Sequence, residues 1–118
     1  MLNSISVFDG TNESFYHGMM LGLCAVLSNQ YRIKSNSESG YGRFDISLIP
    51  DKHTNLGFIF EFKHAKTNNQ DLGALADEAL TQIDEKKYDT EMKTLGVANI
   101  IKIGIAFRGK KAVVKQSN

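Results

Sequence analysis

Two neighbouring stretches, Gly42-Arg43-Phe44-Asp45-Ile46-Ser47-Leu48-Ile49 and Gly57-Phe58-Ile59-Phe60-Glu61-Phe62-Lys63, decide the fold of this chain. Both are rich in aromatic and β-branched residues, and a polar segment with turn-forming residues separates them, which predicts two strands joined by a turn. Successive side chains of a strand point to opposite faces of a sheet. If the strands are antiparallel neighbours with their phenylalanines on one face, then Asp45, Glu61 and Lys63 converge on the other face.

This patch of two carboxylates and one ammonium has the chemistry that holds a divalent metal beside a phosphate. Carboxylate oxygens are preferred ligands of hard ions such as Mg²⁺, which keep several of their waters. The ammonium of Lys63 can either offset charge on the phosphate or help to deprotonate the attacking water, and the sequence leaves both roles open. A Glu-x-Lys pair by itself is more typical of a solvated ion pair, so the interpretation depends on Asp45, Glu61 and Lys63 together.

The bulk composition indicates one globular domain across residues 1–118. The chain is 42% hydrophobic and 23% charged, which excludes a disordered or fibrous class. Its net charge of +1 gives no overall attraction to nucleic acid, so binding of a polyanion requires a local basic patch. Cys24 is the only cysteine, which excludes an internal disulfide and favours a reducing, cytoplasmic location. The longest apolar stretch, 19–27, is about half of the ~20 residues that a membrane-spanning helix needs, so no membrane association is expected.

The order of predicted elements indicates an α/β fold. Helical spacing of apolar residues predicts two helices, at about 13–27 and 71–88, the second ending in basic residues that suit the helix dipole. Besides the two central strands, apolar or alternating runs predict strands at 30–34, 100–107 and 112–115. Polar composition predicts a flexible turn at 35–42 and a charged connector at 89–96. The expected architecture is a mixed central sheet flanked by helices.

Five motifs follow one another on these predicted helices and strands. They are Glu13-Ser14-Phe15-Tyr16-His17, Gly42-Arg43-Phe44-Asp45, Glu61-Phe62-Lys63, Glu78-Ala79-Leu80-Thr81-Gln82-Ile83 with Lys87-Tyr88, and Ile103-Gly104-Ile105-Ala106-Phe107. This arrangement resembles the PD-(D/E)xK nuclease superfamily over almost the whole chain, from 13 to about 114. More narrowly, it resembles the branch found at the C-terminal end of bacterial ATPase-like proteins. Phe44 stands where the superfamily's name has proline, a departure common among divergent members.

The resemblance implies a restriction-endonuclease-like αβββαβ core and Mg²⁺- or Mn²⁺-dependent hydrolysis of phosphodiester bonds. The favoured substrate is DNA rather than RNA. The resemblance also implies that Asp45, Glu61 and the backbone carbonyl of Phe62 bind the metal, and that Lys63 acts on the water or the phosphate. Gln82 is expected at the same site. Glu13 is either a further acidic ligand or a first-turn acid favoured by the helix dipole.

The expected nucleic-acid contacts are Arg43, Tyr88 and Lys66. Arg43 either contacts phosphate or pairs with Glu38, Tyr88 supports Gln82, and Lys66 belongs to a basic rim. The alternative function is a catalytically silent module that binds nucleic acid or an ATPase-like domain of the same protein. No glycine-rich phosphate loop with a following lysine is present, so ATP hydrolysis is not expected of this chain. A homodimer would add stability to a core of this size, and 1–118 can equally be a piece of a longer protein.

Overall fold

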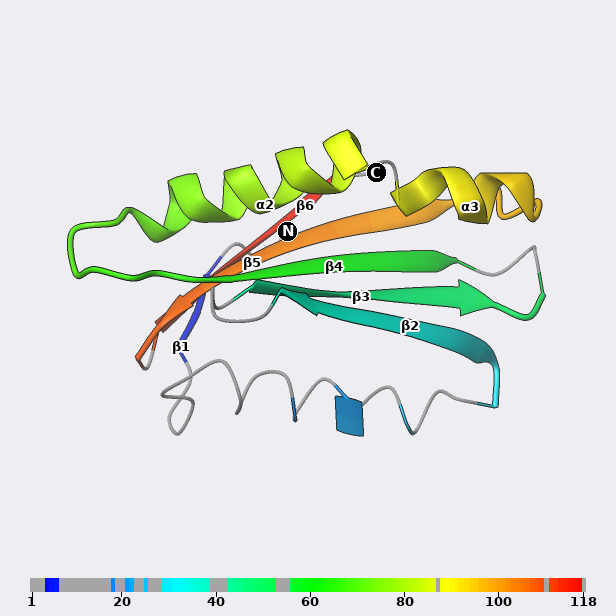
Figure 1. Ribbon diagram of the computed structural model, residues 1–118, viewed down its shortest axis with the longest axis horizontal. Coiled ribbons are helices and arrows are strands. Elements are labelled where there is room, and N and C mark those ends of the chain that lie inside the picture. The colour runs from blue at the N-terminus through cyan, green and yellow to red at the C-terminus, as the bar shows by residue number, and fades with distance from the viewer. Residues whose placement is uncertain are drawn as a thin grey trace.

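The computed structural model describes residues 4–6, 18, 21–22, 25, 29–38, 43–52, 56–86, 88–109 and 111–117. Its described strands form one mixed sheet in the order β1-β6-β5-β4-β3-β2 (Figure 1). The strands are β1 (Ser4–Ser6), β2 (Tyr31–Glu38), β3 (Arg43–Pro50), β4 (Gly57–His64), β5 (Ile100–Arg108) and β6 (Lys111–Ser117). β4 and β5 run parallel and the other neighbours run antiparallel.

Two helices, α2 (Leu72–Lys86) and α3 (Tyr88–Thr94), connect the parallel strands β4 and β5 and lie over the same face of the sheet (Figure 1). Such a parallel pair requires a crossover connection, which a helix usually provides. The predicted α/β fold with a mixed central sheet and packed helices is therefore confirmed. Within the described residues, no helix has the length and apolar character that crossing a membrane requires.

The face of the sheet opposite α2 and α3 carries a ladder of aromatic rings. Phe58, Phe60 and Phe62 stack in sequence with ring centroids 6.2 Å apart at each step. Phe62 is buried there together with Ile46 and Phe107. The alternation of β4 therefore assigns its phenylalanines to one face and leaves Ile59, Glu61 and Lys63 for the other, as predicted.

α2 packs closely on the sheet because β5 carries a glycine at the point of contact. A Cβ atom built on Gly104 would lie 2.5 Å from the carbonyl oxygen of Ala76 and 3.1 Å from the Cβ of Ala79. Both alanines are fully buried on the inner side of α2. Gly104 is the register partner of Glu61 in β4, so this close approach of helix and sheet is next to the glutamate.

The segment 89–96 was predicted to be a charged connector, and this prediction was wrong. α2 ends at Lys86 and a second helix, α3, covers most of the segment. Met92 is fully buried. Asp89 is also buried, and Lys93 and Lys102 pair with it. The charged residues of this segment therefore did not indicate exposure to solvent. α3 ends at Thr94. Gly96 follows with a φ of 93°, which is costly for other residues, and Val97 N–H donates to Met92 O at 3.0 Å.

The first predicted strand was too short, because β2 continues through the serine-rich segment to Glu38. Its last residues pair with β3, with Asn36 opposite Asp45 and Glu38 opposite Arg43. Backbone pairing with a neighbouring strand outweighs polar composition here. Strand β1, which pairs with β6, was not predicted. Gly18, Leu21, Gly22 and Ala25 are helical, and the rest of the predicted first helix lies outside the described residues.

Candidate active site

Asp45 and Glu61 face each other directly across strands β3 and β4. They are register partners of an antiparallel pair, so their Cβ atoms are expected about 5 Å apart on one face of the sheet. Lys63 follows Glu61 on the same face. The three side chains are only 4%, 1% and 5% exposed, respectively. Buried charges are costly unless polar or charged partners accompany them, so a patch of three is informative about function.

Polar groups from the helices accompany these carboxylates. Tyr88, the first residue of α3, donates its O–H to Asp45 Oδ2 at 2.8 Å. Lys86, the last residue of α2, places its Nζ 3.7 Å from Glu61 Oε2. The same ammonium lies 5.5 Å from the centroid of the Tyr88 ring. The junction of α2 and α3 therefore places the phenol of Tyr88 against Asp45 and the ammonium of Lys86 near Glu61.

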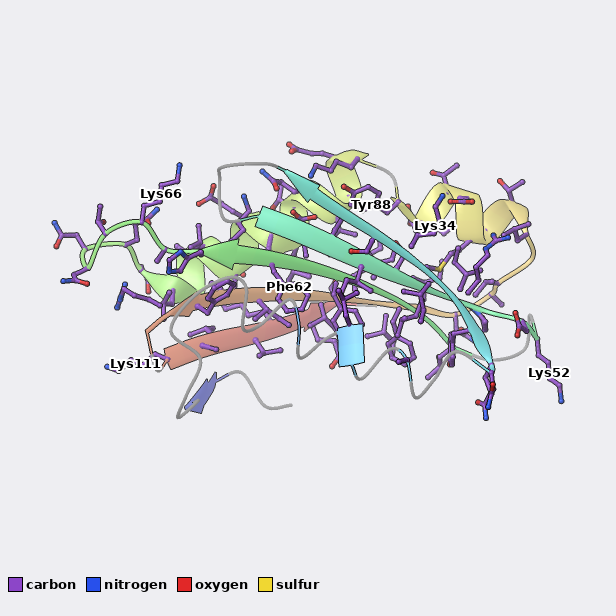
Figure 2. All side chains as sticks on the ribbon, turned by 60° about the horizontal axis from the view of Figure 1, so that its bottom comes forward. Lys34, Lys52, Phe62, Lys66, Tyr88 and Lys111 are labelled. Carbon is purple, nitrogen blue, oxygen red and sulfur yellow. The ribbon has the colours of Figure 1, made fainter. Side chains whose placement is uncertain are left out.

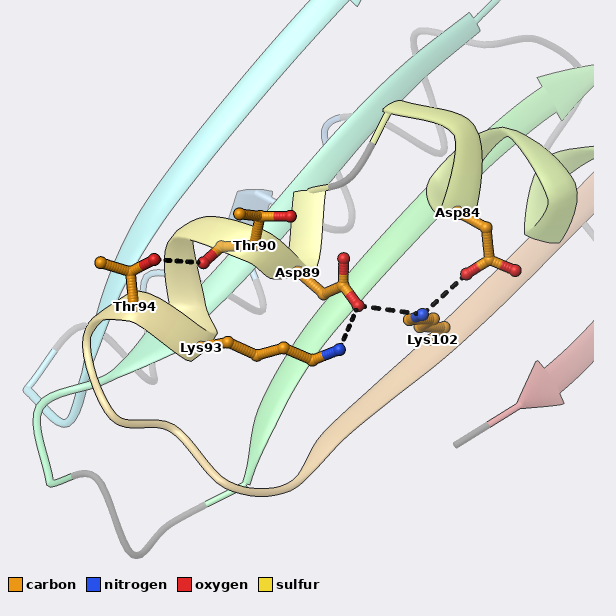
Figure 3. Close-up of polar contacts among 6 residues, drawn as sticks. All are labelled: Asp84, Asp89, Thr90, Lys93, Thr94 and Lys102. Carbon is orange, nitrogen blue, oxygen red and sulfur yellow. Dashed lines mark hydrogen bonds and ion pairs between the residues drawn. The ribbon is translucent and has the colours of Figure 1, made fainter.

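An ion-pair network fixes this junction to the sheet (Figure 3). Lys102 of β5 lies 2.7 Å from Asp84 Oδ1 at the end of α2 and 3.2 Å from Asp89 Oδ2 at the start of α3. Lys93 also reaches Asp89 Oδ2, at 3.0 Å. Hydrogen bonds to Asp84 and Asp89 raise the pKa of Lys102 against the effect of burial. Burial by itself would raise the pKa of Asp89, but hydrogen bonds from Lys93 and Lys102 lower it overall. Both shifts keep the bridge ionised at neutral pH.

Gln82 lies one helical turn before Lys86, on the same side of α2. Its Oε1 atom is buried and has no hydrogen-bond partner among the residues that the structure describes. A buried amide oxygen without a partner is costly and is characteristic of sites that bind a further group. The structure therefore brings Gln82 to the helix surface that carries the lysine beside Glu61.

The structure describes only some of the remaining predicted site residues. Glu13 lies outside the described residues. Arg43 is the register partner of Lys63, and its side chain is outside the described part. Phe62 lies between Glu61 and Lys63 in β4, with its own side chain on the aromatic face. Lys66 lies exposed in the loop after β4, well apart from Tyr88 in Figure 2, so the structure does not bring these two together.

Sequence reasoning missed Lys86 as a site residue and assigned it only to the dipole of the helix end. The available signal was its spacing from Gln82, because residues four apart share one side of a helix. Its distance from Glu61 depends on the close packing at Gly104, which spacing does not reveal.

The donor set suits a hard divalent cation. Asp45 and Glu61 offer carboxylate oxygens from two adjacent strands. Mg²⁺ is usually held by one or two carboxylates and keeps several waters, so this set fits its preferences. The described residues contain no group of three or more His, Cys, Asp or Glu side chains that could enclose a metal. The described part therefore contains two neighbouring carboxylates and no enclosing group of ligands.

Burial raises the pKa of Tyr88 from its ordinary value of 10.0 to about 12, and the hydrogen bond to Asp45 adds to the effect. The folded state therefore favours the neutral phenol. This stabilisation is complete below pH 10 and is lost as the pH rises towards 12.

Tyr88→Phe is accordingly expected to reduce the loss of stability at high pH. The free energy of unfolding, measured with urea between pH 10 and 12, should fall more steeply for the wild type than for the variant. The other tyrosines and the lysines titrate in both proteins, so their effect cancels in the difference between the two free energies of unfolding. Identical slopes would show that folding does not raise the pKa of the Tyr88 hydroxyl.

One of three comparisons with known proteins found a match. The family model described as the PD-(D/E)XK nuclease superfamily matches residues 11–117. The comparisons with curated proteins and with solved structures each gave no match. The matched residues include every described strand except β1, both described helices and the carboxylate pair. The chain therefore belongs to the PD-(D/E)XK nuclease superfamily.

Proposed function

We propose that this domain is a divalent-metal-dependent nuclease that hydrolyses phosphodiester bonds in nucleic acid, and we favour DNA over RNA as its substrate. The observation that carries the proposal is the pair of buried carboxylates, Asp45 and Glu61, in register across β3 and β4 with Lys63 beside them. Membership of a nuclease superfamily whose members typically use divalent metals supports it.

Asp45, Glu61 and the backbone carbonyl of Phe62 would hold Mg²⁺ or Mn²⁺. When bound, such an ion supplies Lewis acidity towards the phosphate and lowers the pKa of water. The chain's own contribution is orientation, because the carboxylates lie on neighbouring strands and Tyr88 fixes Asp45 through its O–H. A ligand held in this way does not have to reorganise during the reaction.

Lys63 would act on the reacting groups from the same face of the sheet. It is 5% exposed, and electrostatic interactions are stronger in such a site than in bulk water. Its ammonium can therefore stabilise charge that builds on the phosphate. In its neutral form, the amine can accept the proton of the attacking water, and the same placement serves either role. Gln82 would orient a group at this site through its amide.

The finer assignment is to the branch found at the C-terminal end of bacterial ATPase-like proteins. It is supported by the motifs on the two predicted helices, including Gln82 and Tyr88. On this assignment the domain works in the cytoplasm, and an ATPase-like domain of the same polypeptide is its partner. Arg43 and Lys66 would contact the nucleic-acid backbone.

The proposal is tested by incubating the purified protein with labelled single-stranded, double-stranded and branched DNA and with RNA, in Mg²⁺, Mn²⁺ or EDTA. We expect cleavage of at least one DNA substrate in either metal and none in EDTA. Binding of DNA without cleavage in all metal conditions would favour the alternative, a catalytically silent module. Equal cleavage in EDTA would exclude the metal mechanism.

A further inference from the structure

Lys86 is placed where a cation entering the carboxylate pair would meet it. Its Nζ lies 3.7 Å from Glu61 Oε2, and Glu61 is 1% exposed. The same Nζ lies over the ring of Tyr88, whose hydroxyl is bonded to Asp45. One ammonium is thus associated with both carboxylates, directly with Glu61 and through Tyr88 with Asp45.

Two adjacent buried carboxylates repel each other, and a nearby positive charge relieves this repulsion. Lys63 is on a strand and is 5% exposed, so its side chain has little freedom to move away. Lys86 differs, because it ends α2 and its side chain is 30% exposed. A lysine on a flexible four-carbon stem at a helix end can move into solvent without disturbing the sheet.

We propose that Lys86 is a built-in counter-ion of the metal-free site and that it leaves Glu61 when a divalent cation binds there. The inference rests on the proposed function, because it presupposes a divalent cation at Asp45 and Glu61. The lysine stabilises the metal-free protein and opposes metal binding, since an ammonium and a divalent ion at one carboxylate repel each other. Lys86 therefore sets the metal concentration at which the site is filled.

This role gives Lys86→Met two effects of opposite sign, which a purely structural residue would not produce. In EDTA the variant should unfold at a lower temperature than the wild type, because Glu61 has lost the positive charge of Lys86. Its affinity for Mn²⁺ should increase by at least about tenfold, because the competing ammonium is gone. The shift in unfolding temperature on adding Mn²⁺ should therefore be larger for the variant.

The experiment is calorimetric titration of Mn²⁺ into the wild type, Lys86→Met, Lys86→Gln and Lys115→Met, with thermal unfolding in EDTA and in Mn²⁺. Lys86→Gln repeats the test in case methionine disturbs folding. Lys115→Met is the matched control, because Lys115 also joins α2 to the sheet, by a 2.9 Å pair with the exposed Asp77. It should leave the affinity for Mn²⁺ unchanged.

Tighter binding by the Lys86 variants supports the inference, including the case in which only these variants bind measurably. Equal or weaker binding by the variants, with measurable binding by the wild type, overturns the inference and leaves the proposed function intact. Absence of Mn²⁺ binding by the wild type and all variants overturns both, because Lys86 then has no cation to yield to.

Discussion

Glu61→Gln is expected to reduce Mg²⁺-dependent cleavage by at least about 100-fold, the effect typical of removing one electrostatic group from an active site. The substitution keeps the size of a side chain that is 1% exposed, whereas alanine would leave a cavity and confuse loss of folding with loss of chemistry. It removes the negative charge that a hard cation requires of its ligand. Single-turnover cleavage rates at saturating DNA measure the effect directly.

Glu85→Gln is the matched control for this prediction. Glu85 is an exposed residue of α2, so the same chemical change there should leave the cleavage rate within about twofold of the wild type, since surface substitutions usually change little. Asp45→Asn should repeat the loss seen with Glu61→Gln. Cleavage at the wild-type rate by both Asp45→Asn and Glu61→Gln would refute the mechanism.

Gly104→Ala is expected to lower both stability and activity. Its new Cβ would lie 2.5 Å from the carbonyl oxygen of Ala76, a backbone atom, so α2 must move away from the sheet. Overpacking of this kind typically costs about 1 to 3 kcal/mol of the free energy of unfolding. The same movement displaces Gln82 and Lys86 from Glu61, and a displacement of about 1 Å at a reacting site can cost about 100-fold in rate.

Gly73→Ala provides the contrast, because Gly73 lies in the first turn of the same helix. A Cβ there would meet its nearest atom, Asp71 Oδ1, at 3.6 Å, an ordinary contact. Replacing a helical glycine by alanine at such a position should add about 0.5 to 1 kcal/mol to the free energy of unfolding. Urea unfolding and cleavage rates measure both variants. Wild-type stability of Gly104→Ala would contradict the close packing of α2 on β5.

The shared face of the carboxylates could be predicted from sequence because it follows from alternation. Residues two apart in a strand share a face, and the phenylalanines of β4 mark the face that must be buried. Once the phenylalanine face of β4 packs on the apolar core, Glu61 can lie only on the other face. It shares that face with Asp45 if β3 and β4 are antiparallel neighbours, as adjacent strands joined by a short turn usually are. Their direct pairing depends on the register, which the structure supplies.

The helix junction could not be predicted, because it depends on contacts between elements distant in the sequence. The charges of Asp89 and Lys93 indicated a solvated connector. Asp89 is instead buried, with Lys93 and the distant Lys102 of β5 as its partners. Because α3 was not predicted, the orientation of the Tyr88 side chain was unknown, and its hydrogen bond to Asp45 could not be inferred. For the same reason, the sequence did not predict that α2 ends at Lys86 or that the ammonium of Lys86 lies near Glu61.

The central claim is that Asp45 and Glu61 together bind a divalent cation. The most direct measurement is a crystal structure of the protein with Mn²⁺, in which anomalous scattering locates the metal independently of its coordination. The account predicts a peak between the two carboxylates, with the Lys86 ammonium displaced from Glu61. The absence of a peak there at saturating Mn²⁺, with Lys86 still at Glu61, would contradict it.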